Sequence, residues 1–400
     1  MSNVTQEVIA AGQQYVMNTY GRYPVVLVEG NGVFAWDGEG NKYLDFLSGI
    51  AVNALGHSHP TVVEAIEEQA KTMMHCSNLY WNEPQVRLAK FLVKNSVCDK
   101  AFFCNSGAEA NEAAIKLARK YAKINLGEEK FEIITALDSF HGRTLGAITA
   151  TGQPKYQKYF DPLPAGFKYV AYDDLEAMKA AIGPNTCAVM LEPIQGEAGV
   201  RVPTYEYMQG VAQLCADNNI LLIMDEVQTG LGRTGKSFGY ELYGIEPDII
   251  TLAKALGGGF PIGAMLAKEH VAKAFQPGDH ASTFGGNPLA CAAGLATVEA
   301  MINLDLLKNV EEVGAYFVGK LEALAQKYAF VKEVRGSGLI LGMELTIEGK
   351  DIVQQCMDKG LLINCANSYV LRFVPPLIIT TGHVDQAMEI LDQVLAETEG

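Results

Sequence analysis

The chain has 400 residues, 49% of them hydrophobic, which is enough to bury a sizeable core and to form roughly two or three compact units. Its 31 basic and 46 acidic residues give a formal net charge of −15, which argues against binding to nucleic acid or anionic membranes. The eight cysteines lack paired metal spacing, so we expect reduced thiols and no metal. Met1 is not followed by a basic leader, and no stretch of about 18 apolar residues occurs, so we expect a cytoplasmic protein with no membrane partner.

The first 50 residues predict an N-terminal arm and part of a small domain. Turns at residues 30–32 and 37–41 separate short extended pieces, as expected for a small sheet. We expect a large domain over residues 51–300 and a smaller α+β domain over residues 301–400. The sequence has no repeat, low-complexity tract or long linker, so these domains should share extensive contacts.

From about residue 101 onward, short apolar runs alternate with helical patterns. The runs cover residues 101–104, 131–136, 188–191, 220–224, 249–252 and 262–267. This alternation predicts an α/β fold in which helices cover a mostly parallel sheet. Farther along, residues 301–328 predict a long helix, and residues 339–345, 361–364 and 370–374 predict strands of the smaller domain.

A turn between a strand and a helix, FFCNSGAEANE over residues 102–112, is a candidate anion site. Alanines recur at helical spacing after Ser106, whose side chain can cap the helix. The backbone N–H groups of Ser106, Gly107 and Ala108, together with the helix dipole, could hold a phosphate. A capped helix without a ligand would explain the same residues equally well.

Asp225 and Lys254 each follow an apolar strand, at the edge where parallel sheets bind their ligands. Asp225 could hold a proton on a ring nitrogen, although a solvated strand end or a helix cap would explain it as well. Lys254 precedes three glycines in TLAKALGGGFPIG, where partial burial would favour the neutral amine that attacks an aldehyde. Lys254 is therefore the strongest single candidate for a catalytic residue.

Residues 230–237, GLGRTGKS, match the spacing of a nucleotide-binding P-loop. A P-loop needs a strand directly before it and a helix directly after it. Here DEVQT intervenes on one side, and SFGYELYGIEP, with two glycines and a proline, follows on the other. The flanking sequence therefore argues against nucleotide binding.

Two arginines are candidates for binding carboxylates. Arg143 lies in the loop SFHGRT, whereas Arg372 lies in an apolar run and would be costly to bury without a partner. Glu197, in the glycine-rich stretch EPIQGEAG, could be that partner, although two unrelated structural ion pairs are an open alternative. His57 and His59 in GHSHP have poor spacing for zinc and suit turn or cap roles.

Together these segments resemble the class III, or ornithine-type, aminotransferases of the fold type I pyridoxal phosphate enzymes. The similarity extends over nearly the whole chain, through YGRYPV, LDFLSGIAVNALGHSHP, FFCNSGAEANEAAIKLARK, FHGRTLG, EPIQGEAGV, DEVQTGLGRTG, AKALGGGFPIGAM, STFGGNPLAC, RGSGLILG and RFVPPL. It implies a seven-stranded, mostly parallel sheet between helices, a smaller α+β domain from both termini, and pyridoxal 5'-phosphate as the cofactor. It also implies a homodimer whose active sites are shared between subunits.

The resemblance assigns roles to residues around the cofactor. Lys254 would bind the cofactor covalently and move protons, and Asp225 would pair with its ring nitrogen. The other contacts would come from Ser106, Gly107 and Ala108 at the phosphate, Phe140 and Val227 on the two ring faces, Gln228 near the ring hydroxyl, and Thr283 of the partner subunit.

The resemblance also assigns the substrate contacts. Arg143 would hold the carboxylate remote from the reacting amine, and Arg372 would hold the carboxylate beside the amine of glutamate. When a substrate has no carboxylate there, Glu197 would pair with Arg372 and neutralise it. Ser282 and Tyr20 complete the implied substrate site.

The implied reaction moves an amino group from an amino donor to 2-oxoglutarate. The segments GIAVNALGHSHP, HCSNLY and CNSGAEANEAAIKLARK are most similar to family members that act on N2-acetylornithine. Members that act on free ornithine carry a tyrosine near Ile50, where this chain has SGIAV. Succinylornithine, ornithine and 4-aminobutyrate are alternative donors. An isomerase acting within glutamate semialdehyde is the alternative of another class, against which Arg372 and Glu197 argue.

Overall fold

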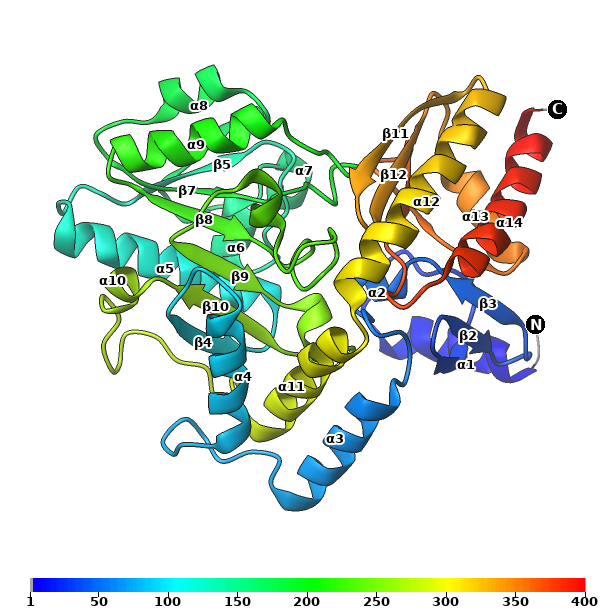
Figure 1. Cartoon of the computed structure of the whole chain (residues 1–400), viewed down its shortest axis with the longest axis horizontal. Coiled ribbons are helices and arrows are strands. Elements are labelled where there is room, and N and C mark those ends of the chain that lie inside the picture. The colour runs from blue at the N-terminus through cyan, green and yellow to red at the C-terminus, as the bar shows by residue number, and fades with distance from the viewer. Residues whose placement is uncertain (1–2, 400) are drawn as a thin grey trace.

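A seven-stranded sheet forms the centre of the larger part of the protein (Figure 1). The computed structural model describes residues 3–399. In spatial order the strands are β4 (Lys100–Cys104), β10 (Gly263–Ala267), β9 (Ile249–Leu252), β8 (Leu221–Asp225), β7 (Thr186–Leu191), β5 (Glu132–Ala136) and β6 (Phe167–Val170). β10 is antiparallel to both of its neighbours, and the other neighbouring pairs are parallel. The predicted α/β fold with a mostly parallel sheet is confirmed.

Helices surround this sheet, and two of them show why its central strands are apolar throughout. Along β7 and β8, Met190 and Ile223 pack in one core with α5, while Val189 and Met224 pack in the other with α9. Strands that are buried on both faces need a continuous apolar run rather than an alternating one. The helices of this part are α3 (Pro60–Thr72), α4 (Glu83–Lys94), α5 (Gly107–Asn125), α6 (Leu145–Ala150), α7 (Pro154–Gln157), α8 (Leu175–Ala181), α9 (Tyr205–Asp217), α10 (Glu269–Ala272), α11 (Pro288–Asn303) and the 3-10 helices η1 (Gly239–Tyr243) and η2 (Lys254–Gly257).

The smaller part contains two four-stranded sheets. One is antiparallel, in the order β11 (Val331–Ser337), β12 (Ile340–Leu345), β15 (Val370–Phe373) and β14 (Asn364–Ala366). The other has the order β1 (Leu27–Asn31), β2 (Phe34–Asp37), β3 (Lys42–Asp45) and β13 (Leu361–Leu362). Its helices are α1 (Asn3–Tyr15), α2 (Ser48–Ala51), α12 (Leu306–Lys327), α13 (Lys350–Asp358) and α14 (Thr381–Glu399). Because β13 pairs with β3, both ends of the chain build this α+β part, as expected. The domain limits at residues 50 and 300 stay predictions.

One predicted helix was wrong, and the strands β6 and β11 were not predicted. The single long helix over residues 301–328 is instead the end of α11 and all of α12, which meet at an angle of 67°. Asp305 lies between them with a φ of 49°, a left-handed conformation that cannot continue a helix. β6 was not predicted because its sequence, FKYV, has two exposed residues in the middle, and an edge strand has one strand neighbour only.

Among residues 3–399, no single helix is both long and apolar enough to cross a membrane, although α11 and α12 taken together meet that criterion by length and composition.

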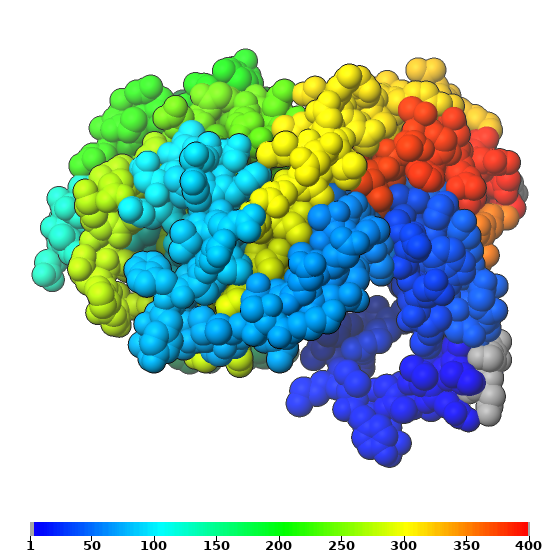
Figure 2. Space-filling model, turned by 60° about the horizontal axis from the view of Figure 1, so that its bottom comes forward, coloured from blue at the N-terminus to red at the C-terminus, as the bar shows by residue number. Residues whose placement is uncertain are grey.

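The N-terminal segment leaves apolar surface uncovered. Figure 2 shows this segment, in dark blue, projecting from the body of the protein. Tyr15, Val16, Met17 and Tyr20 have exposed fractions between 52% and 83%. Such an arm buries little surface within its own chain and is suited to packing on a second molecule.

Candidate active site

A cavity of about 430 Å³ lies at the carboxyl ends of β4, β5, β7, β8 and β9. Ligands of parallel sheets bind at this edge, because successive strands deliver their following loops to the same side. The sequence-predicted residues that line it are Ser106, Gly107, Ala108, Phe140, Arg143, Glu197, Asp225, Val227, Gln228 and Lys254. Residues far apart in the sequence are thus brought together at a single cavity.

The beginning of α5 forms a cradle on one side of this cavity. The Ser106 hydroxyl accepts a hydrogen bond from the backbone N–H of Glu109 at 3.2 Å and so caps the helix. Gly107 opens the helix against Val227, and a Cβ atom at Gly107 would lie only 2.8 Å from Val227 Cγ1. A larger residue would therefore close the space beside the helix N-terminus, where the dipole favours an anion.

Asp225 is 3% exposed and is held in a fixed orientation. Its Oδ2 atom accepts hydrogen bonds from Asn111 Nδ2 and His141 Nδ1, both at 2.7 Å, and its Oδ1 atom accepts one from the Val227 N–H at 3.0 Å. Asn111 and His141 also line the cavity, but the sequence reasoning missed both. His141 lies in SFHGRT next to Phe140, which was a signal that could have found it.

Glu192 is a second buried carboxyl group that the sequence reasoning missed. It follows β7, lines the cavity and accepts a hydrogen bond from the Phe140 N–H at 3.1 Å. Burial, followed by the nearby Asp225 carboxylate, raises the pKa of Glu192 well above its ordinary value. Glu192 thus fixes the segment that carries Phe140.

Lys254 follows β9 and faces the cavity from the start of η2. Its φ of 39° lies in the left-handed region, which a non-glycine residue adopts only where its surroundings enforce it. Burial lowers the pKa of its ammonium group below the ordinary value, against an opposing effect of Glu197. The fraction of neutral, nucleophilic amine is therefore larger than for a lysine in water.

Arg372 and Glu197 form an ion pair beside this lysine. Arg372 lies in β15 and is 1% exposed, and its Nη1 atom donates to Glu197 Oε1 at 2.6 Å and to the Gly196 carbonyl at 3.1 Å. Its Nε atom donates to Asn364 Oδ1 at 3.1 Å. Burial alone would raise the pKa of Glu197, but Arg372 and Lys254 outweigh it and the pKa is lowered. Glu197 is therefore an anion that neutralises a buried guanidinium.

Arg143 is exposed at the cavity wall and packs on aromatic rings. Its guanidinium carbon lies 4.0 Å from the ring centre of Tyr156 and 5.5 Å from that of Phe140. Stacking on a ring restricts the orientation of the guanidinium plane and leaves its N–H groups available to a carboxylate.

Besides Arg372, which contacts the lining residues Glu197 and Gln228, three predicted site residues lie outside the cavity lining of this chain. Tyr20 is 70% exposed on the N-terminal segment, and Thr283 is exposed on the loop before α11. Ser282 accepts hydrogen bonds from Asn105 Nδ2 at 3.1 Å and the Gly285 N–H at 3.0 Å. Their roles at the site stay predictions.

The two competing motifs have structural roles. Residues 230–237 form turns that lead into η1 rather than a strand, loop and helix, and Lys236 pairs with Glu311 at 2.7 Å. His57 pairs with Asp45 at 2.8 Å. In the part of the chain that the structure describes, no group of three His, Cys, Asp or Glu side chains is arranged to hold a metal ion.

The cavity fits pyridoxal phosphate. It offers a helix N-terminus for a phosphate, a fixed carboxylate for a ring nitrogen, a lysine for an aldehyde, and Phe140 and Val227 for the flat faces of a ring.

In comparisons with known proteins, nearly the whole chain matches aminotransferases. The model of the family described as aminotransferase class-III matches residues 15–395. The acetylornithine aminotransferase of Caldanaerobacter subterraneus subsp. tengcongensis is 58% identical over 386 residues, which cover 96% of this chain and 98% of that protein. The acetylornithine aminotransferase of Methanocaldococcus jannaschii is 57% identical and is covered to 97%, against 96% of this chain.

Solved structures are also similar. The ornithine aminotransferase of Toxoplasma gondii superposes with a TM-score of 0.95 at 35% identity, over 99% of this chain and 96% of that one. The acetylornithine aminotransferase of Elizabethkingia anophelis gives a TM-score of 0.87 at 35% identity, over 98% of this chain and 99% of that one.

Proposed function

This chain belongs to the class-III aminotransferases, which use pyridoxal phosphate, and from that premise we propose that it acts on N2-acetyl-L-ornithine. The reaction is N2-acetyl-L-ornithine + 2-oxoglutarate = N-acetyl-L-glutamate 5-semialdehyde + L-glutamate, a step of arginine biosynthesis. We include succinyl-diaminopimelate, which has a similar acylated amino acid skeleton, in this proposal as a second donor. We place the enzyme in the cytoplasm, in keeping with its eight free cysteines.

The chemistry is divided between the cofactor and the residues that hold it. When bound, pyridoxal phosphate supplies an aldehyde that accepts the amino group and a ring that withdraws electrons from the reacting carbon. The start of α5 would bind the phosphate, and Asp225 would keep a proton on the ring nitrogen. Lys254 would hold the aldehyde carbon of the cofactor covalently and, when its amine is free, would move the proton at the carbon that carries the substrate amine.

Two different substrates must use the same site in turn. Glutamate has two carboxylates, whereas acetylornithine has one, together with a neutral amide and a terminal amine that reacts. Arg143 holds the carboxylate remote from the reacting amine in both cases. Arg372 holds the second carboxylate of glutamate. When acetylornithine is bound, the Glu197 carboxylate pairs with Arg372 instead.

The observation that carries this proposal is the ion pair between Glu197 and the buried Arg372. A buried guanidinium without a counter-ion costs several kcal/mol, so a donor that lacks the second carboxylate needs Glu197 in place. An isomerase that never binds glutamate has no need of such a pair.

A panel of amino donors with 2-oxoglutarate as acceptor tests the proposal. We expect kcat/KM to be highest for acetylornithine among acetylornithine, succinylornithine, succinyl-diaminopimelate, ornithine and 4-aminobutyrate. Glutamate alone should convert the cofactor to its amine form and release 2-oxoglutarate. Failure to release 2-oxoglutarate would favour the isomerase, and a higher kcat/KM for another donor would reassign the substrate.

Substituting Glu197 by alanine should separate the two half-reactions. Acetylornithine would then bind beside an unpaired Arg372, whereas glutamate supplies its own carboxylate. We expect the second-order rate constant of the half-reaction, measured in single turnovers, to fall about tenfold more for acetylornithine than for glutamate. Glu312→Ala, which removes an exposed carboxylate of α12, should leave both rates unchanged. Equal losses for the two substrates in Glu197→Ala would contradict the switch.

We also propose a homodimer that completes each site with residues of the other subunit. Leu79, Trp81 and Phe284 are 84%, 91% and 61% exposed, and Asn78 donates to the Ser282 carbonyl at 3.1 Å, so these apolar groups adjoin the loop that carries Thr283. Exposed aromatic side chains of this kind are typical of interfaces. Sedimentation should give twice the mass of one chain, and a monomer that is fully active would refute the shared site.

A further inference from the structure

The loop that carries Glu197 is strained. It leaves β7 and runs through residues 196–201, with a φ of 97° at Gly199 and 54° at Val200. A left-handed conformation is rare for a β-branched residue, and it persists only where neighbouring groups impose it. Val200 is fully buried, so this strain is supported from within the protein.

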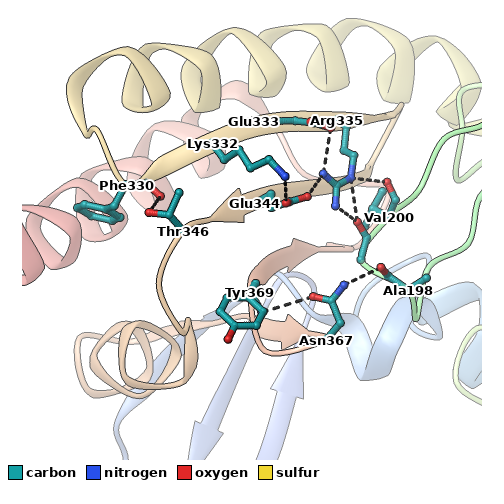
Figure 3. A network of polar contacts seen from close by, with 11 residues as sticks. Ala198, Val200, Phe330, Lys332, Glu333, Arg335, Glu344, Thr346, Asn367 and Tyr369 are labelled. Carbon is teal, nitrogen blue, oxygen red and sulfur yellow. Dashed lines mark hydrogen bonds and ion pairs between the residues drawn. The ribbon is translucent and has the colours of Figure 1, made fainter. Parts of the chain in front are cut away.

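Arg335 of β11 holds this strained backbone. Its Nε atom donates to the carbonyls of Gly199 and Val200 at 3.0 and 3.1 Å, and its Nη2 atom donates to the Gly199 carbonyl at 2.8 Å (Figure 3). Its Nη1 atom donates to Glu333 at 2.9 Å and Glu344 at 2.5 Å, which fixes the plane of the guanidinium. A planar fork with several donors can hold two carbonyls at once, which a lysine ammonium cannot do with the same geometry.

Asn367 holds the preceding carbonyl. It lies in the turn between β14 and β15, and its Nδ2 atom donates to the Ala198 carbonyl at 2.8 Å (Figure 3). Three successive carbonyls, from residue 198 to residue 200, therefore accept hydrogen bonds from side chains of the smaller antiparallel sheet.

The same sheet carries Arg372. Arg335 pairs in register with Gly342 of β12, and Gly342 pairs with Arg372 of β15, so the two arginines flank Gly342 in one row. Residues in register across neighbouring strands project from the same face of a sheet. A Cβ atom at Gly342 would lie 3.1 Å from Val200 Cβ, which shows how closely the loop packs on this row. One arginine thus binds the backbone of the loop, and the other binds the Glu197 carboxylate.

We propose that Arg335 is a positioning residue that holds Glu197 against Arg372 and so sets how readily Arg372 is released to a substrate carboxylate. This inference rests on the proposed function, in which Glu197 competes with the substrate for Arg372. Loosening the loop lowers the cost of displacing Glu197, which favours substrates with two carboxylates. It also leaves Arg372 less well neutralised when a donor with one carboxylate is bound.

Arg335→Gln and Lys332→Gln form a matched pair for the test. Each substitution removes one cation from β11 and one contact with Glu344, but Lys332 reaches Glu344 from the side away from residues 196–201 (Figure 3). Dissociation constants are measured by calorimetry on the holoenzyme with glutarate, which has two carboxylates, and pentanoate, which has one. Single-turnover rates are measured with glutamate and acetylornithine.

Arg335→Gln should raise the affinity for glutarate relative to pentanoate by about fivefold, and shift the ratio of half-reaction rates toward glutamate by a similar factor. Lys332→Gln should leave both ratios within about twofold of the unaltered enzyme. A structural role alone would reduce stability and lower both half-reactions together, without changing either ratio. Unchanged ratios in folded Arg335→Gln enzyme would overturn the inference.

Asn367→Gly provides a second variant in case Arg335→Gln does not fold. It removes the hydrogen bond to the Ala198 carbonyl at a position whose φ of 46° suits glycine. It should shift both ratios in the same direction, and unchanged ratios would again overturn the inference. Glu197→Ala is measured in parallel. If only Glu197→Ala shifts the ratios, the positioning role fails and the switch stands; if no variant shifts them, the switch fails as well.

Discussion

Replacing Lys254 by alanine is expected to lower kcat/KM for transamination by at least about 10⁴-fold. In the proposed function, the substitution removes both the amine that binds the cofactor and the group that moves the proton at the reacting carbon. The lowered pKa of Lys254 suits both tasks, because each requires the neutral amine. Steady-state kinetics with acetylornithine and 2-oxoglutarate give the size of the loss.

Covalent labelling gives an independent test of Lys254. Borohydride reduction of the holoenzyme should attach the cofactor to the peptide that contains Lys254, and the Lys254→Ala variant should lose that label. Lys236→Ala is the matched control, because Lys236 is an exposed lysine that pairs with Glu311. It should keep full activity, and loss of ATP binding in this variant would revive the P-loop interpretation. A cofactor label on any peptide without Lys254 would refute the assignment.

Replacing Asp225 by asparagine should lower kcat by about 10³-fold, because a neutral amide of the same size cannot keep a proton on the ring nitrogen. Asn111 and His141 hold the carboxylate in place, so the loss should come from charge and not from a change of shape. Rapid-scan spectroscopy of the glutamate half-reaction should show that the chemical step is slowed.

Asp248 provides the control for this substitution. It precedes β9 at the opposite edge of the same sheet and accepts a hydrogen bond from the Leu222 N–H. Asp248→Asn should therefore keep the chemical step unchanged even if it alters stability. If Asp225→Asn retained a normal rate, Asp225 could not be the partner of the ring nitrogen.

Much of the fold was predictable because the central strands are buried on both faces. Such strands require continuous apolar runs, and these runs are legible in the sequence without any knowledge of their neighbours. β6 was missed because it lies at the edge of the sheet and has two exposed residues in its middle. The break between α11 and α12 was missed because one left-handed residue, Asp305, interrupts an otherwise helical pattern.

The site was predictable where a residue's own surroundings in the sequence are unusual. Lys254 beside three glycines and Arg372 in an apolar run are examples. Asn111 and Glu192 have ordinary surroundings in the sequence, and they and His141 act through contacts with segments about 30 to 114 residues away in the chain. Arg335 belongs to the same class, because its partners at residues 199 and 200 are 136 and 135 positions distant. Contacts of this kind depend on the topology, which one sequence does not determine.

The pairing of β3 with β13 has a consequence for biosynthesis. During synthesis, residues 42–45 leave the ribosome more than 300 residues before their neighbours at 361–362 are made. β3 therefore stays unpaired along the edge that later binds β13. Meanwhile the larger sheet, whose strands end at residue 267, can already assemble. Arg372 is made later still, so a nascent chain that has completed the larger sheet still lacks the arginine that we propose for substrate binding.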